Sequence, residues 1–495
     1  MDQTQTSTLD CAPDHLLEDL HALRAAVLDE TPRLMARWGI DPDGADAGLA
    51  NLAHYLALRH HDLRPLQRRL MTLGLSSLGR LESRVLPTLD AVTQALQALC
   101  GSGSVPPAAD PDAFFAGEAR LHVAADALFG PAPPHRRSRI MVTLPGEAAT
   151  SPTLLMDLAQ RGMDVARINC AHDNPDTWRK LVGEIRAAGT RIGKTIPVLM
   201  DIAGPKIRTE EVLQVGKRKL ETGDTFRLVA SGAPVLSGGV DFCAAVSEPS
   251  IVTRLEIGDR LRYDDGKLEG VVETIADNEA IIRVTRTKAG GAKLKSEKGL
   301  NVPDTDLGLS PLTVKDEADL AIVLECADMI GYSFIRRPDD IDLLEASIER
   351  LGSGARRPGL VAKIEQPEAV RNLPHLIARA VPKWRLAIMI ARGDLAAEIG
   401  FERLAEMQEE ILWLCEAASV PAIWATQVLE GLVKDGIPSR GEMTDAAMAA
   451  RAECVMLNKG PSIRDGVMVL DRLLNRMEGH MLKKTPTLRA LKAWS

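Results

Sequence analysis

The chain has 495 residues, a length typical of about three domains of roughly 150 residues each. Lysine and arginine number 60 against 68 aspartate and glutamate residues, which gives a net charge of −8 and an isoelectric point near 5.8. Without a basic surplus the chain is a poor match for a phosphate backbone, and we expect no nucleic-acid partner. With 45% hydrophobic and 26% charged residues, the composition is that of a globular protein and excludes disorder as its main feature.

Targeting and redox signals point to the cytoplasm. No run of about 18 apolar residues occurs, so we expect no membrane span and no membrane partner. The segment from Met1 to Asp10 has neither the basic start nor the apolar stretch of a secretory signal. The seven cysteines are an odd number and include no Cys-x-x-Cys pair, which argues against a disulfide framework or a structural zinc site. We therefore expect a reduced, cytoplasmic protein.

Residues 1–100 are expected to form an all-helical region. Leu16, Leu20, Leu23 and Val27 recur with the 4-3-4 spacing that places side chains on one helix face. The same kind of spacing recurs at Leu66, Leu70 and Leu73, and at Leu89, Val92, Leu96 and Leu99. Residues 101–137 are assigned to a linker, because 101–112 are rich in glycine, serine and proline and 131–134 mark a second break. A short helix is allowed between these two breaks.

From residue 138 onward, short apolar segments alternate with helical ones, the pattern of a parallel α/β sheet. Strands are predicted at 140–144, 165–169, 196–201, 329–333, 360–364, 386–391, 421–425 and 454–457. Eight strand–helix units are what a TIM-type (β/α)8 barrel needs. We assign this barrel to residues 138–209 and 299–485.

Residues 210–298 interrupt the third strand–helix unit and have an all-β pattern. Alternating segments at 225–230 and 268–275 are separated by turn residues such as Asp264-Asp265-Gly266. We predict a small β-barrel domain inserted between a barrel strand and its helix, where it can cover the strand ends as a lid. The range 210–298 is called the lid below. The predicted fold class is therefore α/β, a TIM-type barrel with an inserted lid and an all-helical N-terminal region.

Polar residues fall at the carboxyl ends of the predicted strands, where barrels of this kind carry their active sites. These residues are Arg167, Asn169, Asp201, Ser333, Lys363, Glu365, Asp394 and Thr426. Glu365 and Asp394 are hard carboxylates that could hold Mg²⁺ or Mn²⁺, and Lys363 and Arg167 could supply positive charge to a phosphoryl group. An ion-pair network that only fills the barrel mouth is the alternative. The convergence of these groups from separate strands favours a site.

These residues lie in stretches that resemble the pyruvate kinase family over about residues 138–480. The stretches are VARINCAH (165–172), MDIAGPKIRT (200–209), KGLNVP (298–303), AKIE (362–365), ARGDL (391–395), ATQVLE (425–430), PSRGEMTD (438–445) and CVML (454–457). Each stretch alone would be a weak signal. Together, and in order along the chain, they carry the resemblance.

The resemblance implies an enzyme, a phosphotransferase that moves the phosphoryl group of phosphoenolpyruvate to ADP and yields pyruvate and ATP. In this family Glu365 and Asp394 would hold Mg²⁺ or Mn²⁺, and Lys363 with Arg167 would stabilise the transferring group. Thr426 would assist protonation of the enolate through water. The substrate- and nucleotide-binding residues that the resemblance implies are Asn169, His172, Arg208, Ser333 and Gly393.

The monovalent-cation site of the family is altered here. Asn169 and Asp201 are kept, but Ala171 stands where the family has a serine. Lys206 stands where potassium-dependent members have a glutamate, and potassium-independent members are similar to this chain in having a lysine. A tethered ammonium group can replace a bound K⁺ as the local positive charge. We therefore expect activity that does not require K⁺.

Other departures leave alternatives open. The segments 143–146 and 458–461 differ from the family pattern, and the chain stops at Ser495, so the resemblance is to a short form without the family's C-terminal effector domain. A metal-dependent lyase acting on a pyruvate enolate is one alternative, although the lid and Arg208 favour nucleotide chemistry. A catalytically weak paralogue that acts as a binding or regulatory protein is the other. The role of residues 1–100, the nucleotide preference and assembly into a homo-oligomer stay open.

Overall fold

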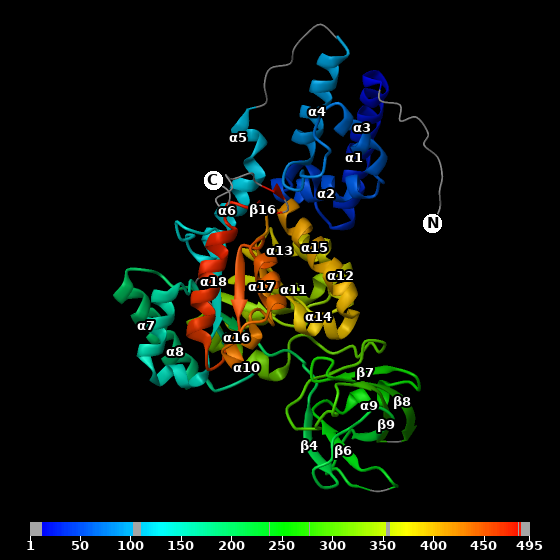
Figure 1. Ribbon diagram of the computed structural model, residues 1–495, viewed down its shortest axis with the longest axis vertical. Helices are drawn as coiled ribbons and strands as arrows, with labels where there is room; N and C mark the ends of the chain where they lie inside the picture. The colour runs from blue at the N-terminus through cyan, green and yellow to red at the C-terminus, as the bar shows by residue number, and fades with distance from the viewer. Residues whose placement is uncertain are drawn as a thin grey trace.

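The structure is a computed structural model that describes residues 12–101, 110–236, 238–276, 278–352, 357–483 and 485–486. Three parts follow one another along its longest axis: a helical bundle, an α/β barrel and a curled β-sheet (Figure 1). Residues 1–11 of the predicted helical region and 102–109 of the predicted linker lie outside the described residues. Among the described residues, no helix combines the length and the apolar character needed to cross a bilayer.

The central part is a closed barrel of parallel strands. In spatial order these are β1 (Arg139–Thr143), β2 (Val165–Asn169), β3 (Val198–Asp201), β11 (Met329–Tyr332), β12 (Gly359–Ile364), β13 (Leu386–Ala391), β14 (Ala422–Ala425) and β15 (Cys454–Leu457). β15 pairs with β1 in the register Arg139↔Cys454, which closes the ring. The strands are almost completely buried, as parallel strands are when helices cover the sheet. The predicted barrel is confirmed, and each strand end lies within two residues of its prediction.

Helices surround the barrel. The longer ones are α7 (Pro152–Arg161), α8 (Pro175–Ile192), α10 (Val314–Cys326), α11 (Pro338–Arg350), α13 (Leu373–Ala380), α15 (Phe401–Ala417), α17 (Arg440–Ala449) and α18 (Ile463–Met477). Shorter ones are α12 (Pro367–Arg371), α14 (Arg392–Ile399) and α16 (Glu430–Asp435). Local sequence explains where they begin: Thr313 and Asp316 form a reciprocal capping box at the start of α10.

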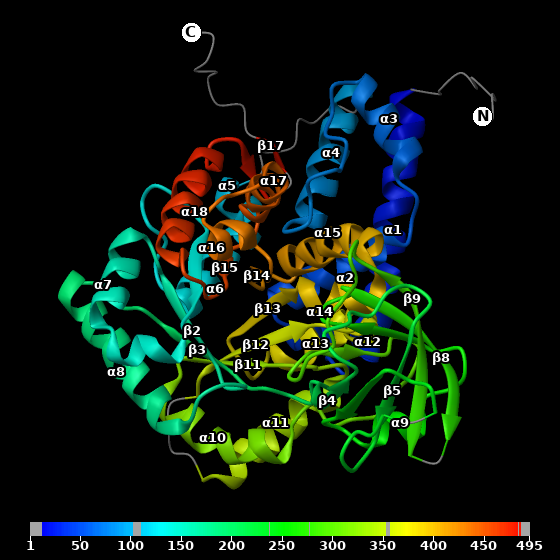
Figure 2. The same cartoon turned by 60° about the horizontal axis from the view of Figure 1, so that its bottom comes forward.

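The insertion between β3 and α10 forms a separate curled sheet, drawn in green in Figures 1 and 2. Its strand order is β10 (Leu300–Asn301), β7 (Arg260–Tyr263), β8 (Leu268–Ala276), β9 (Glu279–Thr287), β5 (Thr225–Val229), β6 (Phe242–Val246) and β4 (Thr209–Gln214). The sheet has its own apolar core, which includes Phe226, Tyr263 and Ile282. The predicted turn Asp264-Asp265-Gly266 joins β7 to β8 with positive φ at all three residues. The inserted all-β lid is therefore confirmed.

The N-terminal part is a bundle of α1 (Pro13–Arg37), α2 (Ala47–Arg59), α3 (Arg64–Thr72) and α4 (Val85–Leu99). The predicted face from Leu16 to Val27 is buried along α1. Leu99, predicted on the buried face of α4, is 56% exposed because it is the last residue of that helix. The bundle packs against barrel helix α15, where the Asn51 amide donates to the Ala417 carbonyl at 2.8 Å.

The predicted linker 101–137 contains more structure than its composition indicated. Besides the short α5 (Pro111–Phe114), it holds α6 (Ala116–Phe129), which lies at the amino ends of the barrel strands. Ala125, Leu128 and Phe129 join the apolar interior of the barrel, and Leu128 packs so closely on Gly359 that a Cβ there would clash. The helix therefore closes the barrel at the end opposite the predicted site. Glycine, serine and proline mark only the edges of this range, whereas its middle has helical apolar spacing.

Candidate active site

The predicted site residues gather at the carboxyl ends of the barrel strands, around a cavity of about 190 Å³ called the central cavity. The predicted residues that line it are Arg167, Asn169, Lys206, Arg208, Ser333, Lys363, Glu365, Asp394 and Thr426. Asp201, His172 and Gly393 do not line it. Asp201 lies directly behind the lining, in contact with Arg167 and Lys363. The barrel thus brings together groups that are up to 259 positions apart, from Arg167 to Thr426.

Lys363 is the best-anchored cation of the cavity. Its Nζ lies 2.9 Å from Glu365 Oε1, 3.3 Å from Asp201 Oδ1 and 2.7 Å from the Ser333 hydroxyl. Burial alone would lower the pKa of Lys363, but the two carboxylates raise it above its ordinary value. The side chain therefore stays charged at neutral pH and points into the cavity from β12.

Arg167 on β2 is held by Asp201 at the end of β3. The guanidinium forms two hydrogen bonds to Asp201 Oδ2, one of them at 2.9 Å from Nε, and a third at 2.9 Å to the Thr143 hydroxyl. The Asp201 side chain has room beside β11 because residue 331 is a glycine. A Cβ atom at position 331 would lie 2.7 Å from the Asp201 carboxylate. Although burial opposes ionisation, Lys363 and Arg167 keep the pKa of Asp201 below its usual range. Asp201 therefore positions two cations without entering the cavity.

Glu365 and Asp394 are the carboxylates that face the cavity. Burial raises the pKa of Glu365, and the negative charge of Asp394 raises it further against the opposing effect of Lys363. Glu365 Oε2 accepts a hydrogen bond of 2.6 Å from the Phe334 backbone N–H. For Asp394, burial opposes ionisation, but the ammonium of Lys206, 2.7 Å from Oδ1, holds the pKa below its usual range.

A divalent ion fits this donor set. Two hard carboxylate oxygens face one cavity and repel each other electrically, and a Mg²⁺ or Mn²⁺ ion would relieve that repulsion. Mg²⁺ is usually held by one or two carboxylates and completes its shell with water and substrate oxygens. In agreement with such an open site, no group of three or more metal-ligating side chains occurs among the described residues.

Lys206 lines the central cavity together with Asn169 and pairs with Asp394. Asn169 and Asp201, the other residues of the predicted potassium-site region, are register partners on β2 and β3. Lys206 pairs with Asp394, and its other charged neighbours are Asp265 of the lid and Glu365. Its ammonium group therefore adds positive charge beside the two carboxylates that face the cavity.

Thr426 has an unusual backbone that the surrounding residues maintain. It follows β14 with φ of 61°, a conformation that β-branched residues rarely adopt. Its hydroxyl oxygen accepts a hydrogen bond from the Gly393 N–H at 2.7 Å, and its carbonyl accepts one from Arg392 at 2.6 Å. Arg392 is itself held by Asp445 through a two-point ion pair. This arrangement fixes the Thr426 hydroxyl at the cavity wall.

The predicted nucleotide side lies toward the lid and β2. Asn169 Oδ1 accepts a hydrogen bond from the Ala171 N–H at 3.1 Å, which shapes the turn after β2. The half-buried Arg208 lies just before the lid and donates to the Glu297 carbonyl at 3.1 Å. Partial burial, Lys459 and Arg208 lower the pKa of His172, so its ring is neutral at pH 7. His172 lies outside the central cavity lining.

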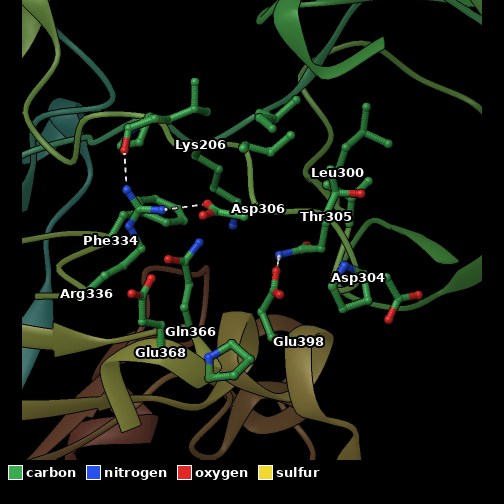
Figure 3. A pocket seen from close by; sticks show the side chains of 18 of the residues that line it. Lys206, Leu300, Asp304, Thr305, Asp306, Phe334, Arg336, Gln366, Glu368 and Glu398 are labelled. Carbon is green, nitrogen blue, oxygen red and sulfur yellow. Dashed lines mark hydrogen bonds and ion pairs between the residues drawn. The ribbon is translucent and has the colours of Figure 1, made fainter. Parts of the chain in front are cut away.

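A larger cavity of about 460 Å³ adjoins the central one and shares Lys206 and Phe334 with it (Figure 3). It lies between the segment that returns from the lid to the barrel and the loops after β11 and β12. Arg336 donates to Asp306 at 3.2 Å, and Glu398 accepts from Asn301 at 2.7 Å across its walls. The cavity thus marks the junction between lid and barrel.

Some contributing residues were not assigned from sequence. Phe334 N–H, Thr143, Arg392 and Asp445 each orient a predicted site residue. Arg392 and Asp445 lie in the stretches ARGDL and PSRGEMTD. Opposite charges in these two stretches were the sequence signal that could have indicated their ion pair. The Phe334 N–H had no side-chain signal at all.

Comparison with known proteins agrees with this arrangement. The family model "Pyruvate kinase, barrel domain" matches residues 135–463. A pyruvate kinase of Mycobacterium intracellulare is 31% identical over 345 residues, 69% of each chain, and one of Agrobacterium vitis is 33% identical over 367 residues, 72% of each chain. A crystal structure of a pyruvate kinase from Cryptosporidium parvum is similar with a TM-score of 0.59 and 27% identity, covering 71% of this chain and 72% of that one. The chain therefore belongs to the pyruvate kinase family and is a pyruvate kinase-like phosphotransferase.

Proposed function

We propose that the protein transfers the phosphoryl group of phosphoenolpyruvate to ADP and yields pyruvate and ATP. One observation carries the proposal: three cations, Arg167, Lys206 and Lys363, converge on the same cavity as the carboxylates Glu365 and Asp394. This pattern suits a doubly charged phosphoryl group together with a divalent ion. In the reaction the bond from phosphorus to the enol oxygen breaks, and a bond to a β-phosphate oxygen of ADP forms.

The cations stabilise charge that develops on the transferring group. Phosphoryl transfer requires little covalent chemistry from a protein, and its catalysis is mainly positioning and electrostatic stabilisation. Lys363 and Arg167 are buried and already oriented by carboxylates, so little reorganisation is needed when substrate binds. We assign to them the phosphoryl oxygens of the transition state.

Glu365 and Asp394 are the residues that would hold the divalent ion, since family members generally use Mg²⁺ or Mn²⁺. A bound ion of this kind acts as a Lewis acid and as a template for substrate oxygens. The chain's own contribution is to hold both carboxylates in place, facing the cavity. Lys363 and the Phe334 N–H do so for Glu365, and Lys206 does so for Asp394.

The enolate that remains must take a proton at its terminal carbon to become pyruvate. Thr426 is the proposed group that delivers this proton, through a water molecule. Its hydroxyl oxygen accepts from the Gly393 N–H, which leaves its own O–H free to donate toward the cavity that it lines. The support from Arg392 and Asp445 would keep that direction fixed.

We further propose that K⁺ is not required. The ammonium group of Lys206 places one fixed positive charge beside Asp394 and near Glu365. A mobile monovalent ion would otherwise have to supply a positive charge of this kind. A cytoplasmic location is also proposed, supported by the free thiols of the six cysteines in the described part of the chain.

The test is pyruvate formation from phosphoenolpyruvate, ADP and Mg²⁺, first in potassium-free buffer and then with K⁺ added. Turnover without K⁺ is the expected result. A rise of about tenfold or more on adding K⁺ would keep the reaction and overturn the proposal for Lys206. Absence of turnover in both buffers, with a folded protein, would overturn the proposed reaction in favour of a binding or regulatory role.

A further inference from the structure

A cavity of about 340 Å³ in the lid is lined mainly by lysines. Its lysines are Lys219, Lys267, Lys288, Lys293, Lys295 and Lys298. The range 210–298 contains only one further lysine, Lys217. Like charges gathered around one hollow repel one another, so this arrangement costs free energy unless an anion occupies it. We call this cavity the lysine pocket.

The arginines of the lid are distributed differently. Arg218, Arg227, Arg260, Arg262 and Arg283 each form an ion pair with a carboxylate. Among the described residues, Asp264 is the one carboxylate in the lining of the pocket, and it lies 2.8 Å from Lys267 and 3.1 Å from Lys298. Five of the seven arginines in the lid are therefore paired with carboxylates, whereas positive charge is in excess at this pocket.

The floor of the pocket is rigid. Tyr263 is buried on β7, and its hydroxyl accepts a hydrogen bond from the Lys295 N–H at 2.8 Å and donates to the Lys293 carbonyl at 3.1 Å. Leu294, between them, is buried in the lid core. Lys293 and Lys295 are exposed, flank the buried Leu294, and both line the pocket. The tyrosine thus presents two lysines together.

We propose that the lysine pocket binds a ligand that carries two or more linked phosphate groups, at a site separate from the central cavity. The two cavities share no lining residue. Lysine ammonium groups bind phosphate as point charges, and several of them around one hollow match several phosphate oxygens better than a single carboxylate. The volume falls within the range of roughly 300 to 1,000 Å³ that is usual for small-molecule sites.

Occupancy of this pocket has a route to the barrel. The segment 293–298 continues directly into β10, which pairs with β7, and Asn301 of β10 donates to Glu398 of barrel helix α14 at 2.7 Å. A ligand that bridges Lys293, Lys295 and Lys298 would restrain this return segment. The expected signature is reduced amide exchange over residues 288–298.

The test is hydrogen–deuterium exchange of the full chain with inorganic tripolyphosphate at constant ionic strength. Wild type and the control Lys217→Gln should show protection over residues 288–298. The double variant Lys293→Gln/Lys295→Gln should lose it or need at least tenfold more tripolyphosphate. Both variants change exposed lysines, so a circular dichroism spectrum like that of wild type is expected. Equal protection in the double variant, or protection confined to the barrel, would overturn the proposal.

Further probes identify the ligand chemistry. Orthophosphate should need at least tenfold higher concentration than tripolyphosphate, and equal potency would overturn the requirement for linked phosphates. Stronger protection by ATP than by tripolyphosphate would identify a nucleotide tail as the source, whereas equal protection would identify the phosphates alone. None of these measurements uses turnover, so their failure leaves the proposed function unaffected.

Discussion

At the scale of single residues, three of the cations that line the central cavity are held by three carboxylates. Asp201 lies behind Arg167 and Lys363, while Glu365 and Asp394 share the cavity with Lys363 and Lys206. The ion-pair network and the candidate active site, which the sequence analysis treated as alternatives, therefore consist of the same residues. Neighbouring opposite charges favour the ionised forms of Asp201, Lys363 and Asp394, and the cavity leaves one side of the network open to a ligand.

Replacing Lys363 by methionine tests the main catalytic assignment. The change keeps the length of the side chain but removes the charge assigned to the phosphoryl group. We expect kcat to fall by roughly 1,000-fold or more, with a smaller change in the KM for phosphoenolpyruvate. Lys180→Met, on an exposed position of α8, should leave kcat unchanged. Steady-state kinetics provide the measurement, at a temperature where unfolding curves show both variants folded. A Lys363→Met enzyme within tenfold of wild type would refute the role.

Glu365→Ala tests the divalent-ion assignment. Loss of one of two carboxylate ligands should raise the Mg²⁺ concentration for half-maximal activity by at least about tenfold and lower the maximal rate as well. Glu368→Ala is the matched control. Glu368 lies three positions after Glu365 and is ion-paired with Arg337. A Mg²⁺ titration of activity measures both. An unchanged Mg²⁺ midpoint in Glu365→Ala would place the ion elsewhere.

The sequence predicted which side chains meet here but not how they are held. Lys363 and Glu365 could be predicted from the sequence because polar residues at strand ends stand out against the apolar strands. The hydrogen bond from the Phe334 N–H to Glu365 could not be predicted, because a backbone donor carries no sequence signal. The contact of Lys206 with Asp394 was not predicted, because it depends on the path of the chain between β3 and the lid.

At the scale of elements, the barrel strands were predictable because each is a short apolar run that is buried on both faces. The lid strands were predictable from alternation and from the Asp264-Asp265-Gly266 turn. A short helix was allowed where α6 lies, but its packing on the barrel was not predicted. Its apolar residues pack on strand ends that lie far away in sequence, and no local pattern indicates that contact.

Phe129→Ala tests the closure of the barrel by α6. Phe129 is 1% exposed inside the barrel cluster, and truncation of a buried phenylalanine costs about 3–5 kcal/mol of folding free energy. Phe401→Ala, at a phenylalanine that is 65% exposed on α15, should cost much less. Chemical denaturation measures both free energies. Because α6 lies at the end opposite the central cavity, KM for phosphoenolpyruvate should be unchanged in the folded Phe129→Ala enzyme. An altered KM would show that α6 affects the site.

At the scale of the whole molecule, the lid and the helical bundle occupy opposite ends of the barrel (Figure 1). The lid joins the barrel beside the central cavity, through Asn301 to Glu398 and through Arg262 to the Ala397 carbonyl. The bundle instead shares one continuous apolar core with the barrel helices. We infer that the lid is the part suited to move during turnover and that the bundle acts as a fixed support for α15.

The contact between bundle and barrel also predicts how stability depends on pH. Glu416 on α15 is buried there, and it lies near Glu82 in the turn before α4, Glu118 on α6 and Glu453 of the barrel. Burial raises the pKa of Glu416 from 4.5 to about 8; Lys483 opposes this change and the neighbouring carboxylates add to it. A carboxyl group whose pKa is raised on folding stabilises the protein fully below its ordinary pKa. This stabilisation is lost as the pH rises from about 4.5 through about 8.

Glu416→Gln should remove this pH dependence, because glutamine keeps the size and polarity of the protonated acid and cannot ionise. We expect the variant to gain stability relative to wild type between pH 5 and pH 8.5, by at most about 1.4 kcal/mol per pH unit. Glu402→Gln, exposed at the start of the same helix, should show no such trend. Urea unfolding of the three proteins at both pH values gives the comparison. If the difference between Glu416→Gln and wild type is constant with pH, Glu416 ionises normally and the bundle does not bury it.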